Sequence, residues 1–177
     1  MKCSHCSSTL ENPDVINSTA YFVCGDCGEV LEVENYKQLS LEDSIKLFES
    51  EFGYSLPLSF TKVIGKKNSL SIALPEAMTK MTKLYFQDGI YDFRGFPTAD
   101  PNSLERLSIF DTLYLVKEWE LPKELLLIDG DGHTWIALDY RLNHSNPRVI
   151  VIEAETNEYL VVADSFSDFL DKLEPSE

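Results

Sequence analysis

Residues 125–140 read LLLIDGDGHTWIALDY, and this stretch decides the fold. An apolar run at 125–128 is followed by the sequence DGDG at 129–132, and residues 135–138 return as a second apolar run. Glycine and aspartate between two apolar runs are typical of a β-hairpin, because they tolerate the backbone angles of tight turns. The stretch therefore predicts two antiparallel strands.

Outward from this hairpin, the chain carries further strand signals. Residues 149–152 and 159–162 predict a second hairpin, so four strands follow one another. Upstream, apolar residues alternate with small ones over 70–74 and predict a strand, and another strand is expected over 83–86. Residues 89–102, rich in Gly, Pro and Asp, are expected to form a long loop with one short strand.

Four helices are predicted from apolar residues at helical spacing and from residues that cap helix ends. They are expected over 41–52 between the capping pair Ser40 and Asp43 and the stop Gly53, from Pro57 to Gly65, from the cap Ser108 through Trp119, and from Asp164 or Ser165 onward. The order is then two helices, strands, a helix, four strands and a helix. This order predicts an α+β fold, with a mostly antiparallel sheet and helices packed on it.

The charge of the chain restricts its partners. Its 177 residues include 15 Lys+Arg and 30 Asp+Glu, a formal net charge of -15. Such acidity disfavours binding to nucleic acid or to an anionic membrane, because both carry negative charge. The sequence has no apolar run as long as a membrane span, and its first residues lack the apolar segment of a signal peptide. We therefore expect a cytoplasmic protein with no nucleic-acid or membrane partner.

The cysteines predict a metal site near the start of the chain. They are spaced C-x2-C-x17-C-x2-C, as Cys3, Cys6, Cys24 and Cys27. Two thiolates separated by two residues lie on one tight turn and hold one side of a Zn2+ ion, so two such turns complete a tetrahedral shell. We expect a structural zinc site with these four ligands in a small β ribbon at residues 1–34, followed by the α+β domain at 35–177.

Other uses of the cysteines are less favoured. Two disulfides would need an oxidising compartment, and a redox C-x-x-C would need a single pair at the start of a helix in a larger fold. His5 lies inside the first turn, and four thiolates already suffice, so we expect it on the surface. Many zinc ribbons bind nucleic acid. Residues 1–34 contain one basic residue, Lys2, against six acids, so we do not expect this ribbon to bind DNA.

Known catalytic motifs give no support to an enzyme. The sequence has no G-x-S-x-G, no G-x-x-x-x-G-K-[ST] and no H-E-x-x-H. His133 follows a glycine turn and His144 lies in a loop, so neither indicates a base beside a nucleophile. Asp129-x-Asp131 with Asp139 nearby would suggest calcium, but the loop lacks the glutamate of an EF-hand. The acids offer many carboxylate pairs without a spacing that singles one out, and we expect no catalytic residues.

Two stretches resemble the SUKH superfamily. They are WELPKELLLIDGDGHTWIALDY at 119–140 and VADSFSDFLDKL at 162–173. The first half agrees more loosely, with an amphipathic helix before Leu56-Pro57 and Phe60, so the resemblance spans about residues 40–173. The superfamily includes yeast cell-wall-synthesis regulators and many bacterial immunity proteins that neutralise toxins. The resemblance implies an α+β, non-enzymatic domain with a protein partner, and the cysteine ribbon lies outside it.

The resemblance and the charge lead to one functional hypothesis. Many bacterial toxins are nucleases with basic clefts, which an acidic protein can occupy with carboxylates in place of phosphates. We expect an immunity protein or antitoxin that blocks a toxin domain, a nuclease being the class that the charge fits. The alternative is a regulatory module that binds endogenous proteins without a toxin. An acidic surface would also be explained by solubility alone. The acids that we expect to contact the partner are Glu153, Glu155, Glu158, Asp164, Asp168 and Asp171.

Overall fold

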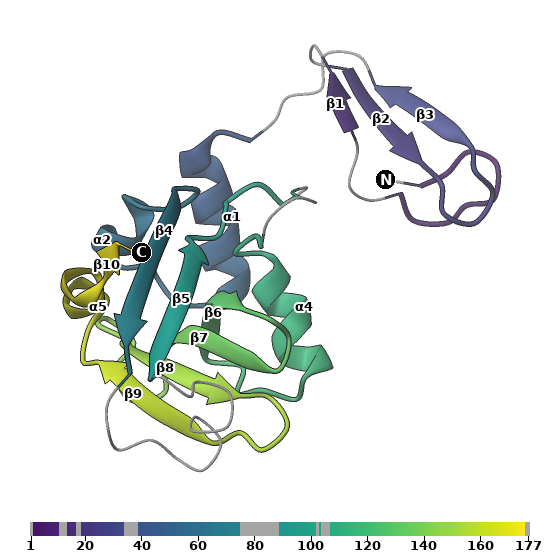
Figure 1. Cartoon of the computed structure of the whole chain (residues 1–177). Helices are drawn as coiled ribbons and strands as arrows, with labels where there is room; N and C mark the ends of the chain where they lie inside the picture. Colours follow the sequence, from purple (N-terminus) through teal and green to yellow (C-terminus); the bar gives the residue numbers. More distant parts are fainter. Residues whose placement is uncertain are drawn as a thin grey trace.

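The computed structural model describes residues 2–10, 14–16, 19–33, 39–74, 89–101, 103 and 107–175. In chain order they form β1 (Asp14–Ile16), β2 (Thr19–Val23), β3 (Val30–Val33), α1 (Leu41–Phe52), α2 (Leu58–Thr61), β4 (Lys67–Ala73), β5 (Ile90–Gly95), α4 (Asp111–Glu118), β6 (Leu125–Gly130), β7 (Thr134–Asp139), β8 (Arg148–Glu153), β9 (Tyr159–Ala163), α5 (Phe166–Lys172) and β10 (Glu174–Pro175). The strand expected over 83–86 lies outside the described residues. The α+β class is confirmed, since every ladder between these strands is antiparallel and helices pack on the sheets (Figure 1).

The N-terminal strands form a sheet of their own, with the order β1-β2-β3. Ala20 and Phe22 of β2 point to the same face and are buried together with Leu10. Two cysteines, Cys3 and Cys24, complete this small apolar cluster, so the cysteine turns and the sheet share one core.

We call the part of the chain that follows the ribbon, from residue 39 onward, the second part. The four consecutive strands predicted over residues 125–162 form its central sheet, with the order β6-β7-β8-β9. Both of its faces are buried, because Leu126 and Ile128 join one apolar cluster whereas Leu125 and Leu127 join another. The turn of the first hairpin is shorter than predicted. Residue 129 and Gly130 continue β6, and a register shift between residues 127 and 129 marks a β-bulge at Ile128.

A second sheet of this part has the order β10-β4-β5. Residues 89–102 were expected to be mainly loop, but six of them form β5, whose Tyr91 and Phe93 are buried while Ile90 and Asp92 are exposed. The prediction missed this regular alternation because it gave greater weight to the glycine, proline and aspartate of the segment. The short strand β10, which pairs with β4, was not predicted either.

Helix α1 has the predicted boundaries for the predicted reasons. Asp43 donates its backbone N–H to the side chain of Ser40 at 3.1 Å, and Ser40 has the extended backbone of an N-cap. At the other end Gly53 adopts φ 84°, a left-handed conformation that glycine reaches without a steric cost. Phe48 and Phe52 face the core from this helix.

Helix α4 begins two residues later than predicted. Ser108 does not cap it, because its hydroxyl accepts the N–H of Phe110 at 3.3 Å in a preceding turn. The backbone N–H of Ser108 donates to the carboxylate of Asp111 at 2.7 Å, and Ser108 also forms an isolated bridge with Thr98. Ser108, although its residue type is common at helix caps, is therefore used in the turn that leads into the helix.

Within the described residues, none of the helices has the length and apolarity of a membrane span.

Candidate functional site

The first two cysteines and the last two lie on turns with the same backbone geometry. In the first turn, Cys3 donates its N–H to the carbonyl of Ser8, and Ser7 donates to the carbonyl of Cys3. In the second turn, Cys24 bonds in the same way to Glu29, and Gly28 to Cys24. Ser7 and Gly28 correspond and both are left-handed, with φ 63° and φ 74°. The sequence therefore builds one cysteine turn twice.

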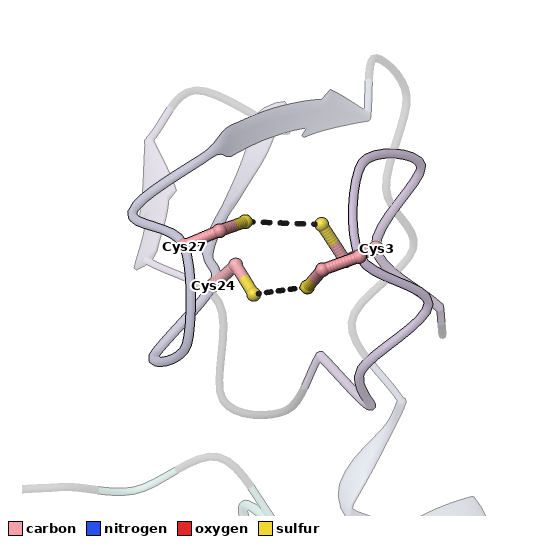
Figure 2. Close-up of side chains that lie close together, drawn as sticks. Cys3, Cys24 and Cys27 are labelled. Atoms are coloured by element: carbon pink, nitrogen blue, oxygen red, sulfur yellow. Dashed lines mark hydrogen bonds between the residues drawn. The ribbon is translucent and has the colours of Figure 1, made fainter.

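The two turns face each other and bring four sulfur atoms together (Figure 2). Cys3 Sγ lies 3.6 Å from Cys27 Sγ, and Cys6 Sγ lies 3.4 Å from Cys24 Sγ. All four sulfurs lie within 4.8 Å of one another. A tetrahedral ion with metal–sulfur bonds of about 2.3 Å separates its sulfurs by about 3.8 Å, so this donor set fits a thiolate-bound metal.

Electrostatics within the cluster also fit a cation at its centre. Hydrogen bonds from the hydroxyl and the amide of Ser8 lower the pKa of Cys6 to about 6. The amide of Glu29 acts to lower the pKa of Cys27, but desolvation and the neighbouring thiols raise it to about 12. Four thiols at this separation resist ionising together, and a divalent ion removes that resistance because it binds thiolates and releases their protons.

His5 has the position expected of it. Its side chain is exposed, and among the described residues the group that could hold a metal ion consists of the four cysteines. Its backbone N–H donates to Cys3 Sγ at 3.4 Å, so His5 contacts the sulfur cluster through its amide.

The acids expected to contact a partner do not all lie on the surface. Glu155, Glu158, Asp164, Asp168 and Asp171 are exposed. Glu153 is not, with 5% of its surface accessible and its carboxylate accepting the hydroxyl proton of Thr156. Glu153 also accepts the N–H of Asn157 at its backbone carbonyl, so it shapes the β8–β9 turn.

Part of the exposed set lies beside aromatic side chains. His133 Nδ1 lies 3.5 Å from Glu155 Oε1, which joins the β6–β7 turn to the β8–β9 turn. The ring of Trp119, at the end of α4, lies 5.8 Å from that of His133, and a Cβ added at Gly132 would lie in van der Waals contact with it. Asp131 is exposed in the same turn. We call Trp119, Asp131, His133, Glu155 and Glu158 the turn patch.

Two buried aspartates have roles that the sequence did not indicate. Asp129 Oδ2 accepts the backbone N–H of Arg94 at 2.9 Å, and its Oδ1 lies 3.2 Å from Arg94 Nε. Desolvation raises the pKa of Asp129 despite these bonds. Because β5 and β6 belong to different sheets, this carboxylate joins the two sheets.

Asp139 joins the end of β7 to the start of β8. Arg141 Nε donates to it at 2.7 Å and Arg148 Nε at 2.9 Å, and both guanidinium groups lie over the ring of Tyr159. Burial alone would raise the pKa of Asp139, but the hydrogen bonds from the two arginines hold it below its usual value. Asp129, Asp131 and Asp139 therefore serve separate contacts rather than a common calcium site. The available sequence signal was that two arginines, Arg141 and Arg148, follow this hairpin aspartate.

Taken together, these observations define an α+β domain that follows a four-cysteine ribbon. Comparison with protein-family models matches residues 40–172 to the SMI1/KNR4 family (SUKH-1). The chain belongs to this family, and a protein-binding role follows at the level of the family. The cysteines lie before the matched residues. No curated protein and no solved structure matches the chain.

Proposed function

We propose that this chain is a non-enzymatic immunity protein of the cytoplasm that binds a toxin domain and blocks it. The observation that carries the proposal is the membership of residues 40–172 in the SUKH-1 family. The net charge of -15 supports a partner with a basic surface, and a nuclease has such a surface where it binds nucleic acid. The toxin is then inhibited by steric exclusion and by carboxylates that occupy its phosphate sites.

The turn patch is the part of the acidic surface that suits a binding centre best. It combines the exposed carboxylates of Asp131, Glu155 and Glu158 with a half-buried Trp119. Tryptophan is enriched among the residues that dominate binding energies, and its ring also attracts the lysines and arginines of a basic partner. Asp164, Asp168 and Asp171 form the second candidate face, at and along α5.

We further propose that Cys3, Cys6, Cys24 and Cys27 hold one structural Zn2+. Four thiolates satisfy its tetrahedral preference, and no ligand position remains for a catalytic water. When bound, the ion supplies folding free energy to a ribbon whose own core consists of a few residues.

Two matched charge reversals test which face binds. Glu155→Lys/Glu158→Lys changes the turn patch, and Asp168→Lys/Asp171→Lys changes α5 by the same charge. We expect the first pair to lose the partner captured from the source lysate at low salt, and the second pair to retain it. Circular dichroism of both variants checks that they remain folded.

Co-expression with the captured partner tests the function itself. The wild-type chain should restore growth to cells that express the toxin, and the turn-patch variant should not. A single basic partner released by rising salt supports the proposal, because screening weakens a charge-driven complex. Several weak partners without growth rescue would contradict it and indicate a regulatory module instead.

A further inference from the structure

A groove between α1 and α4 has a chemistry unlike the rest of this acidic surface. It has a cavity volume of about 550 Å³, and Figure 1 shows the two helices side by side. The floor is apolar and contains Phe52, Leu113, Val116 and Leu121. Phe52, Val116 and Leu121 keep 7–8% of their surface exposed, whereas many core residues keep none. The groove therefore gives solvent access to the edge of the core.

The rim of the groove is basic on one side. Lys117 of α4 and Lys123 of the following loop line it, and both are exposed. Neither makes an ion pair with any residue that the structure describes. Glu51 of α1 lines the groove as well. Two lysines beside one carboxylate reverse the local sign of charge in a chain with twice as many acids as bases.

We infer that this groove binds a small apolar carboxylate. Ligand pockets typically measure roughly 300–1,000 Å³ and combine an apolar lining with a few polar groups that orient the ligand. The apolar body of such a ligand contacts Phe52, Leu113 and Leu121, and its carboxylate lies between the ammonium groups of Lys117 and Lys123. A neutral ligand of the same shape lacks this second contact, and an ammonium ligand is repelled by the lysines. No residue of the turn patch lines the groove, and the inference does not depend on the proposed toxin.

Titration of the full-length protein with octanoate tests the inference, with 1-octanol and octylammonium as neutral and cationic probes. Backbone amide NMR signals report the site of binding. We expect saturable octanoate shifts at residues 52–54 and 113–123, with weaker binding of octanol and the weakest binding of octylammonium. Shifts that do not saturate, or that fall elsewhere in the chain, would overturn the inference.

Variants separate the charge from the shape of the site. Lys117→Gln/Lys123→Gln should weaken octanoate binding roughly fivefold and leave octanol unchanged, the range expected for two exposed ion pairs. Lys46→Gln/Lys62→Gln removes the same charge outside the groove and should change nothing. Glu51→Gln should tighten octanoate binding, because it removes the carboxylate of the rim. Equal loss in the two double variants would show that net charge alone drives binding and would overturn the assigned site.

Discussion

Asp139 has no solvent exposure and is held by two guanidinium groups. Arg141 and Arg148 are themselves mostly buried beside Tyr159, so the loss of the carboxylate would leave two cations near an aromatic ring with no anion between them. Breaking one side of a buried ion pair generally costs more than the pair contributes, because a desolvated charge remains. Asp139 therefore fixes the corner where β7 passes to β8.

Asp139→Asn should lower the free energy of unfolding at neutral pH by about 2 kcal/mol, somewhat below the range for fully buried pairs because the arginines keep some exposure. The pKa of Asp139 is lowered by folding, so its stabilisation is present above its unfolded pKa, about 3.9, and disappears as pH falls through the folded pKa. Urea unfolding at a series of pH values from neutral into this range measures the difference.

Asp92→Asn is the matched control, because it removes the same charge from an exposed position on β5. Its stability should follow that of the wild type at every pH. A difference between Asp139→Asn and wild type that stays constant down to the lowest pH would contradict the assigned role of the charge.

In the paired cysteine turns, the geometry of the whole turn, rather than any single residue, brings the cysteines together. Both turns use the same two backbone hydrogen bonds and the same left-handed residue after the second cysteine. One turn has glycine there and the other has Ser7, which carries a side chain in a conformation that costs L-residues about 1–2 kcal/mol. The first turn is therefore the more strained of the two.

Ser7→Gly should tighten zinc binding up to about fivefold, and Gly28→Ala should weaken it by a similar factor, because strain of about 1 kcal/mol is removed or added. A Cβ at Gly28 meets no atom within 4 Å, so backbone strain alone decides the effect. Competition with a chromogenic chelator measures the affinity. Gly25→Ala, in the same turn but without a positive φ, should leave the affinity unchanged and is the control.

Elements were predictable where one local signal decided them. The capping pair and glycine stop of α1, and the apolar runs of β6 to β9, act through nearby residues, and the structure reproduces them. The predicted start of α4 was wrong because Ser108, which has the residue type of a helix cap, uses its hydroxyl and its backbone N–H in the turn before the helix. Strand β5 was underestimated because its glycine and its aspartate lie in a strand whose buried face is set by distant packing.

The sites, like the elements, were predictable where local sequence decided them and were not where distant contacts did. The cysteine spacing was sufficient to bring four ligands together, since each pair lies on one turn. Charge alone could not separate Glu153 from its exposed neighbours, because its burial depends on the β8–β9 turn folding back over it. The contact of Asp129 with Arg94 was not predicted because Arg94 lies in another sheet, far away in the sequence.

At the scale of the molecule, the ribbon has its own sheet and its own apolar cluster. Cys24→Ser should release the metal and unfold residues 1–34, because this cluster is too small to fold without it. The rest of the chain should keep its melting temperature, since its two apolar clusters contain no residue of the ribbon. Zinc content and a calorimetric scan measure the two effects.

A fall in the melting temperature of the main transition would contradict this independence. Ser4→Ala, an exposed substitution in the first cysteine turn, is the control and should retain the metal. Release of zinc without loss of ribbon structure would contradict the structural role of the ion.

The pairing of β10 with β4 has a consequence for the synthesis of the chain. The ribbon can fold as soon as residue 33 has left the ribosome, because its strands and cysteines are then all present. The sheet β10-β4-β5 is completed much later, since residue 174 pairs with residue 71 and β4 gains this partner only after β10 has been translated. A nascent chain therefore carries a complete four-cysteine ribbon before the β10-β4-β5 sheet is complete, and this edge of β4 stays unpaired until β10 has left the ribosome.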